Sequence, residues 1–85
     1  MNKYESIIIV NPKLNEKQQN EIENKYKKII NKNGNVISIE NIGKKRLAYE
    51  VKKNKEGIYI EINFTSEASF IAELERQYKI DENVI

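Results

Sequence analysis

Residues 43–51 read Gly-Lys-Lys-Arg-Leu-Ala-Tyr-Glu-Val, which joins a strand pattern to a cluster of positive charge. Its second half alternates apolar residues with small or polar ones, as a half-buried strand does. In an extended chain Leu47, Tyr49 and Val51 share one face, so we predict that all three are anchored in a core. Gly43 is the point where a bend or bulge can re-aim the three cations that follow it. The sequence therefore predicts a strand that holds a positive cluster at a fixed place, the alternative being a solvated loop.

The neighbouring segments extend this strand into a hairpin. Residues 36–51 are β-prone but long for one uninterrupted strand, so we predict a bend or bulge near Gly43. Residues 52–57 form a polar loop in which Gly57 is available for positive φ. A further strand over residues 58–64 alternates strictly. Its predicted inward residues are Ile58, Ile60, Ile62 and Phe64, and its outward residues are Tyr59, Glu61 and Asn63.

A first strand is predicted over residues 4–10, because a β-branched run ends there at Asn11-Pro12. Both faces of this strand are apolar, which predicts a central place in the sheet. We expect Ile8 and Val10 to point to the core, and Ile7 and Ile9 to point away from it.

Two helices are predicted between and after the strands. Asn15 is suited to cap the first helix, with Gln18 reaching back to it, and Gly34 is suited to the left-handed position after its last turn. Thr65 or Ser66 is suited to cap the second helix. Apolar residues recur at helical spacing in both: Ile22, Tyr26, Ile29 and Ile30 in the first, and Phe70, Ile71, Leu74 and Tyr78 in the second.

The element order β-α-β-β-α, with the start of a further strand at Val84-Ile85, predicts an α+β fold. We predict a ferredoxin-like split β-α-β sandwich, in which two helices cover one face of an antiparallel sheet and the fourth strand is cut short. Eighty-five residues allow a single domain, residues 1–85.

The composition argues against several functions. The chain has no Cys and no His, which removes disulfides, the commonest metal ligands and the usual general base. Its serines have no His to activate them and its glycines are scattered, so we predict no enzyme, no metal and no cofactor. The longest apolar run, residues 7–10, is too short to span a membrane and no signal-peptide pattern precedes it, so the cytoplasm is the expected compartment.

The segment Gly-Lys-Lys-Arg-Leu-Ala-Tyr at residues 43–49 resembles the core motif of the bacterial small ribosomal subunit protein six family. Asn11-Pro12, Leu74-Glu75-Arg76 and Asn83-Val84-Ile85 are similar to other parts of the family pattern, in order and at near-matching spacing. The resemblance implies a structural constituent of the small ribosomal subunit that binds small-subunit ribosomal RNA together with ribosomal protein eighteen. Family members normally continue past residue 85 into a fourth strand and a tail. Either the C-terminus was cut or this version closes its sheet differently.

Candidate binding residues follow from this resemblance and from the charge clusters. Although the net charge is only +2, a local basic patch matters more to phosphates than the total. The predicted RNA-binding residues are Lys44, Lys45, Arg46, Lys3, Lys52 and Lys53. Of these, the lysines outside residues 44–46, and Lys55 with them, either contact RNA or keep loops soluble. The predicted protein-partner residues on the uncovered sheet face are Ile7, Ile9 and Tyr59, the alternative being ordinary exposed apolar residues.

Two other interpretations remain open. An RNA-recognition motif shares this topology, but the third strand offers only Tyr59 outward, beside Glu61, which repels phosphate. A small-molecule-binding regulatory domain of the same topology is the alternative that involves no RNA. Tyr49 is either a base-stacking residue or a core residue, and its spacing with Leu47 and Val51 favours the core.

Overall fold

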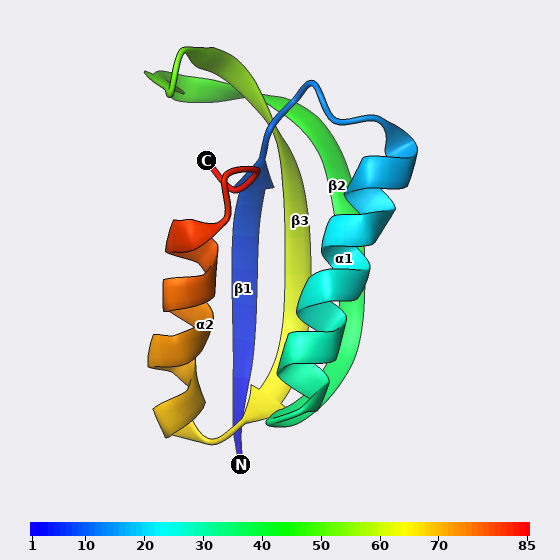
Figure 1. Cartoon of the computed structure of the whole chain (residues 1–85), viewed down its shortest axis with the longest axis vertical. Helices are drawn as coiled ribbons and strands as arrows, with labels where there is room; N and C mark the ends of the chain where they lie inside the picture. Colours follow the sequence, from blue (N-terminus) through cyan, green and yellow to red (C-terminus); the bar gives the residue numbers. More distant parts are fainter.

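A single strand, β3 (Asn54–Ser66), lies at the centre of a three-stranded antiparallel sheet in the computed structural model, which describes all 85 residues. Strand β1 (Asn2–Val10) pairs with one side of β3 and strand β2 (Gly34–Val51) with the other (Figure 1). The predicted alternation is confirmed: the inward residues Ile58, Ile60, Ile62 and Phe64 are at most 2% exposed.

Both helices, α1 (Glu16–Asn31) and α2 (Ala68–Ile80), cover the same face of this sheet (Figure 1). Asn15 accepts a hydrogen bond from the backbone N–H of Gln18, whose side chain accepts one from the backbone of Asn15, so the predicted capping box is present. The two apolar helix stripes join the inward residues of the strands in one core. Its buried helix members are Ile22, Tyr26, Ile30, Phe70 and Leu74. The structure is therefore the predicted ferredoxin-like split β-α-β arrangement.

Strand β1 is not the central strand, contrary to the prediction. Its outer edge carries only the last residues of the chain, where Val84 forms a bridge to Val10 and the N–H of Ile85 donates to the carbonyl of Ile9 over 2.8 Å. Ile8 and Val10 do point to the core, and Ile7 and Ile9 do point away. Apolar residues on both faces of a strand indicate that both faces are covered. They do not indicate whether the strand has a neighbour on each side within the sheet.

The glycines and one helix cap also differ from the predictions. Gly34 does not adopt positive φ; a Cβ there would overlap the backbone carbonyl of Thr65, so close strand packing requires the glycine. Gly57 lies inside β3, where a Cβ would overlap the side chain of Ile9. Helix α2 is capped by Glu67 without a side-chain hydrogen bond, because Ser66 is buried at the end of β3 and donates to the carbonyl of Glu67.

A buried carboxylate ties α1 to the turn after α2. Asp81 Oδ2 accepts hydrogen bonds from the Tyr26 hydroxyl at 2.7 Å and from Lys25 Nζ at 3.0 Å, while Oδ1 accepts from the backbone N–H of Asn83 at 3.0 Å. Burial alone would raise the pKa of Asp81, but these hydrogen bonds hold it below its usual value. Burial and the neighbouring carboxylate raise the pKa of Tyr26, so the hydroxyl stays protonated and remains a donor.

Replacing Asp81 with Asn should therefore destabilise the chain at neutral pH by about 1–3 kcal/mol, because the charge-assisted hydrogen bonds of a buried group are removed. Since the folded-state pKa lies below the unfolded one, the carboxylate stabilises the fold above the usual pKa of 3.8, and this contribution is lost as the pH falls below it. Urea unfolding between pH 7 and pH 2 should show a shallower acid loss for Asp81→Asn than for the native chain. Glu75→Gln, an exposed carboxylate on α2, is the charge-matched control. If the free energy of unfolding fell equally steeply with decreasing pH in the native chain and in Asp81→Asn, this role of Asp81 would be contradicted.

Candidate nucleic-acid interface

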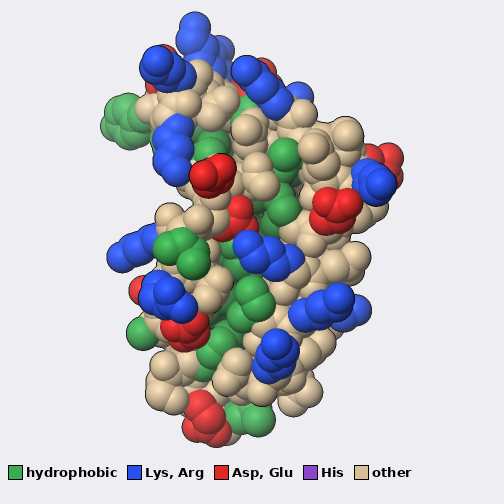
Figure 2. Space-filling view, viewed as in Figure 1, with side chains coloured by type: hydrophobic (Ala, Val, Ile, Leu, Met, Phe, Trp, Pro, Cys, Tyr) green, Lys and Arg blue, Asp and Glu red, His purple; other side chains and the backbone are tan.

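The positive charge of the chain is concentrated on the hairpin that joins β2 to β3, residues 44–57, here named the basic hairpin. These residues include six Lys or Arg and two Glu, a net +4, whereas the whole chain carries only +2. The remainder of the molecule is therefore net negative, by two charges. The hairpin extends beyond both helices at the end of the molecule away from the N-terminus (Figure 1), where Lys and Arg side chains gather on the surface (Figure 2).

No cation of the basic hairpin forms an ion pair within the chain. The only salt bridges join Lys25 to Asp81 and Arg76 to Glu73, and both lie outside residues 44–57. Arg46 lies opposite Glu56 in the strand register without pairing to it. All six positive charges are thus free for an external anion.

The turn of the basic hairpin lies at Lys52 and Lys53, which have positive φ of 47° and 67°. Val51 pairs with Asn54 across this two-residue turn. The prediction that Gly57 supplies the positive φ is wrong, since Gly57 lies three residues beyond Asn54 inside β3. Two positive φ angles are the signature of a type I′ turn, whose twist matches that of paired strands. Lys is an unusual choice for it, because a side chain is strained in the left-handed region.

Gly43, with φ of 106°, lies at one of the three register shifts of β2, as the sequence predicted. Past this bulge the three cations alternate between faces of the hairpin. Lys44 lies opposite Ile58 and Arg46 opposite Glu56, while Lys45 lies opposite Gly57 and places its Nζ 6.0 Å from the ring centre of Tyr59. Lys45 therefore belongs to the helix-free face of the sheet and the other two to the opposite side.

Tyr49 is not a core residue, contrary to the prediction: it is 83% exposed. Between the pairs Arg46–Glu56 and Val51–Asn54, four residues of β2 face only one residue of β3, so this part of β2 bows out of the ladder. Leu47 is half-buried against Gly57, and Val51 is exposed as well.

The structure brings most of the predicted binding residues together but leaves Lys3 apart. Lys44, Lys45, Arg46, Lys52 and Lys53 all lie on the basic hairpin. Lys3 pairs with Thr65 at the opposite end of β1, six residues from Ile9, which corresponds to about 20 Å along the strand.

The predicted protein-partner residues form one patch on the helix-free face. Ile9 lies directly opposite Tyr59, and Ile7, which is 52% exposed, is its neighbour along β1 on the same face. Two carboxylates lie in the same row as Ile7: Glu61 is its direct partner across β1 and β3, and Glu40 lies opposite Glu61 across β2 and β3. On the helix-free face the apolar patch is thus bordered directly by the two carboxylates.

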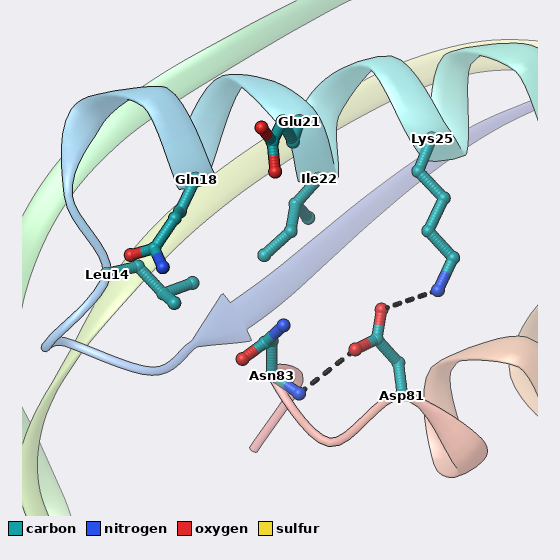
Figure 3. A pocket seen from close by; sticks show the side chains of 7 residues that line it. All are labelled: Leu14, Gln18, Glu21, Ile22, Lys25, Asp81 and Asn83. Carbon is teal, nitrogen blue, oxygen red and sulfur yellow. Dashed lines mark hydrogen bonds and ion pairs between the residues drawn. The ribbon is translucent and has the colours of Figure 1, made fainter.

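A cavity of about 270 Å³ lies between the first half of α1 and the turn after α2 (Figure 3). Lys25 and the backbone of Asn83 both point at Asp81, the buried carboxylate that borders it (Figure 3). Both carboxylate oxygens of Asp81 already accept hydrogen bonds within the chain, so this group has a structural role. No group of three or more metal-ligating side chains is present. Neither helix is long and apolar enough to cross a membrane.

Comparison with known proteins decides the family. A family described as ribosomal protein S6 matches residues 3–85. The chain belongs to the ribosomal protein S6 family. It is 43% identical to the small ribosomal subunit protein bS6 of Clostridium acetobutylicum and 42% identical to that of Cutibacterium acnes, over 100% of this chain and 90% of each relative. The crystal structure of 30S ribosomal protein S6 from Thermotoga maritima has a TM-score of 0.90 and 33% identity, covering 98% of this chain and 79% of that one.

Membership of the S6 family agrees with the sequence prediction that the chain is a ribosomal protein and not an enzyme. The motif that first indicated the family, residues 43–49, forms the base of the basic hairpin. Sequence reasoning missed the exposure of Tyr49, because strict alternation was extended through a bulge.

The strained turn offers a direct test of the hairpin geometry. Replacing Lys52 with Asn and Lys53 with Gly should stabilise the chain by about 1–2 kcal/mol, since these residues tolerate positive φ. Thermal unfolding measures the gain. The double variant Lys44→Gln and Lys55→Gln removes the same charge without touching the turn and should change stability by less than about 0.5 kcal/mol. An unfolding midpoint for the turn variant at or below that of the native chain would contradict the type I′ assignment.

Proposed function

We propose that this chain, a protein of the small ribosomal subunit by family, binds small-subunit ribosomal RNA through the basic hairpin, together with ribosomal protein eighteen. It acts on the ribosome in the cytoplasm as one structural domain over residues 1–85, and it needs no cofactor. The observation that carries the RNA assignment is the net +4 on residues 44–57 of a chain whose remainder is net negative.

Phosphate contacts explain why such a hairpin suits RNA. Lys and Arg that neutralise phosphates release condensed counterions, and this supplies much of the binding free energy. A cation already paired within the chain would first have to break that pair, whereas the hairpin cations have none to break. Arg46 has the geometry to hold one phosphate at two points, which Lys cannot do.

The sheet face is a poorer site for RNA than the hairpin. The opposed carboxylates Glu40 and Glu61 occupy its centre and repel phosphate. The stacking mode of an RNA-recognition motif, which uses the central strands, is therefore disfavoured. A regulatory small-molecule site has less support, because the buried carboxylate beside the 270 Å³ cavity is fully bonded within the chain.

The helix-free face suits a protein partner instead. Ile7, Ile9 and Tyr59 offer an apolar patch, and the carboxylates beside it favour a partner that carries positive charge. The assignment of ribosomal protein eighteen to this patch rests on the family resemblance and on this complementarity.

The RNA assignment is tested by replacing Lys44, Lys45 and Arg46 with Ala. Affinity for small-subunit ribosomal RNA should fall, and the slope of log affinity against log salt should become shallower by about 2–3 units, because each phosphate that is no longer neutralised removes about one unit. Filter binding or fluorescence anisotropy, repeated at salt concentrations from about 50 to 300 mM, measures both the affinity and the salt slope, because the screening of charges increases over this range.

The matched control replaces three exposed lysines outside the hairpin, Lys13, Lys17 and Lys27, with Ala. It removes the same charge but should leave the salt slope unchanged. Equal slopes for the native chain and the hairpin variant would refute the assignment of residues 44–46.

The protein-partner patch is tested with Ile7→Asn and purified ribosomal protein eighteen. The substitution should weaken binding by about 5- to 30-fold, as truncation of a central interface residue does. Ile37 is equally exposed, 54% against 52%, and lies on β2 at a bulge, so Ile37→Asn is the matched control and should change affinity less than about 2-fold. Equal affinities of both variants would place the partner elsewhere.

A further inference from the structure

Tyr49 is an aromatic ring presented to solvent within the most basic part of the chain. Of the five tyrosines, Tyr26 is fully buried and the other three are partly buried, whereas Tyr49 is 83% exposed. Its hydroxyl makes no hydrogen bond within the chain, and its ring contacts neither another aromatic ring nor a cation. The ring therefore has no role in the packing of the folded chain.

The backbone holds Tyr49 in this position. The register jumps from Arg46–Glu56 to Val51–Asn54, so that residues 47–50 oppose Lys55 alone. Bulges of this kind re-aim side chains and recur next to functional sites. Leu47 anchors the start of the bowed segment against Gly57, and the tight turn at Lys52 and Lys53 fixes its end. The bowed segment is thus bounded by Leu47 and by the turn, and it directs the aromatic ring outward.

The charge around the ring selects the kind of ligand. Lys44, Lys45 and Arg46 precede the bowed segment and Lys52, Lys53 and Lys55 follow it, all without an internal ion pair. In Figure 2, hydrophobic side-chain surface lies beside Lys and Arg side chains at the hairpin end of the molecule. Positive grooves that carry an exposed aromatic ring bind unpaired nucleotides, because cations hold the backbone while the ring stacks on a base. A positively charged protein partner would be repelled from this end.

We propose that Tyr49 stacks on an unpaired base of the RNA that the basic hairpin binds. The proposal rests on the RNA-binding function proposed above and adds a selectivity that charge alone does not give. Phosphate contacts hold paired and unpaired RNA alike, whereas a stacking ring requires a base outside the helical stack, as in a loop, a bulge or a single-stranded end. The ligand of Tyr49 is therefore an unpaired nucleobase, with little preference among the four bases.

A fluorescent variant tests the stacking directly. The chain contains no Trp, so Tyr49→Trp introduces one emitting indole at the site. Oligouridylate and a fully paired RNA duplex of the same length serve as probes at low salt. The indole emission should be quenched by oligouridylate and should stay unchanged when the duplex binds. Quenching by neither probe, although both bind, would overturn the proposal.

Affinity measurements on the full chain give the second arm. Tyr49→Leu keeps an apolar side chain without a ring and should weaken binding to oligouridylate and to small-subunit ribosomal RNA by roughly 5- to 100-fold. Tyr49→Phe keeps the ring and should bind within about 2-fold of the native chain. The salt slope should be the same for all three, because the cations remain. Thermal unfolding midpoints should also agree, since an exposed side chain carries little stability.

The outcomes separate this inference from the function on which it rests. If the native chain binds no RNA, the proposed function fails and the stacking role fails with it. If Tyr49→Leu binds RNA as the native chain does while the cation variant shows a shallower salt slope, only the stacking role is overturned. Loss of binding to ribosomal protein eighteen in Tyr49→Leu, with RNA binding unchanged, would assign the ring to the protein partner and likewise overturn the proposal.

Discussion

The inward row of β3 is the constraint on which the rest of the structure depends. Ile58, Ile60, Ile62 and Phe64 lie beneath both helices and are almost fully buried. Burial of such side chains stabilises the fold by about 1.5–3 kcal/mol each, so a slip of one residue in β3 would expose the whole row. Because β1 and β2 both pair with β3, its register also fixes theirs. The basic hairpin is therefore positioned by a row of apolar residues that begins just beyond its base.

Positive and negative charges occupy different parts of the molecule. The hairpin end carries an excess of positive charge, and the centre of the helix-free face carries Glu40 and Glu61 opposite each other. Like charges directly opposite destabilise a sheet, so this pair lowers the stability of the fold. Its effect on ligands is to keep phosphates away from the central strands. In the proposed mode of binding, RNA would therefore contact the hairpin, and the apolar patch beside the carboxylates would be left for the proposed protein partner.

The elements with regular periods were predictable from the sequence. The strict alternation of β3, the capping box of Asn15 and Gln18 and the helix stripes depend on neighbours along the chain, and each was confirmed. The bulge at Gly43 was also predicted, because glycine marks such positions. The family motif at residues 43–49 indicated the ribosomal family correctly.

The features that depend on strand register and strand direction could not be predicted from the sequence. The exposure of Tyr49 follows from a register shift, and the shift depends on which residues of β3 face β2 rather than on local pattern. The predicted loop over residues 52–57 contains the turn, but the positive φ angles belong to Lys52 and Lys53 and were wrongly assigned to Gly57, which serves strand packing against Ile9. The separation of Lys3 from the hairpin likewise depends on the direction of β1.

The reach of the hairpin beyond the helices has a consequence for its motion. Its outer part extends beyond the helices (Figure 1), and the ladder between β2 and β3 is interrupted at residues 47–50. Segments that bury little apolar surface open locally at a small fraction of the global unfolding free energy. The tip can therefore open locally while the core stays intact. Binding of RNA would then slow amide hydrogen exchange in the hairpin far more than in β1 or the helices.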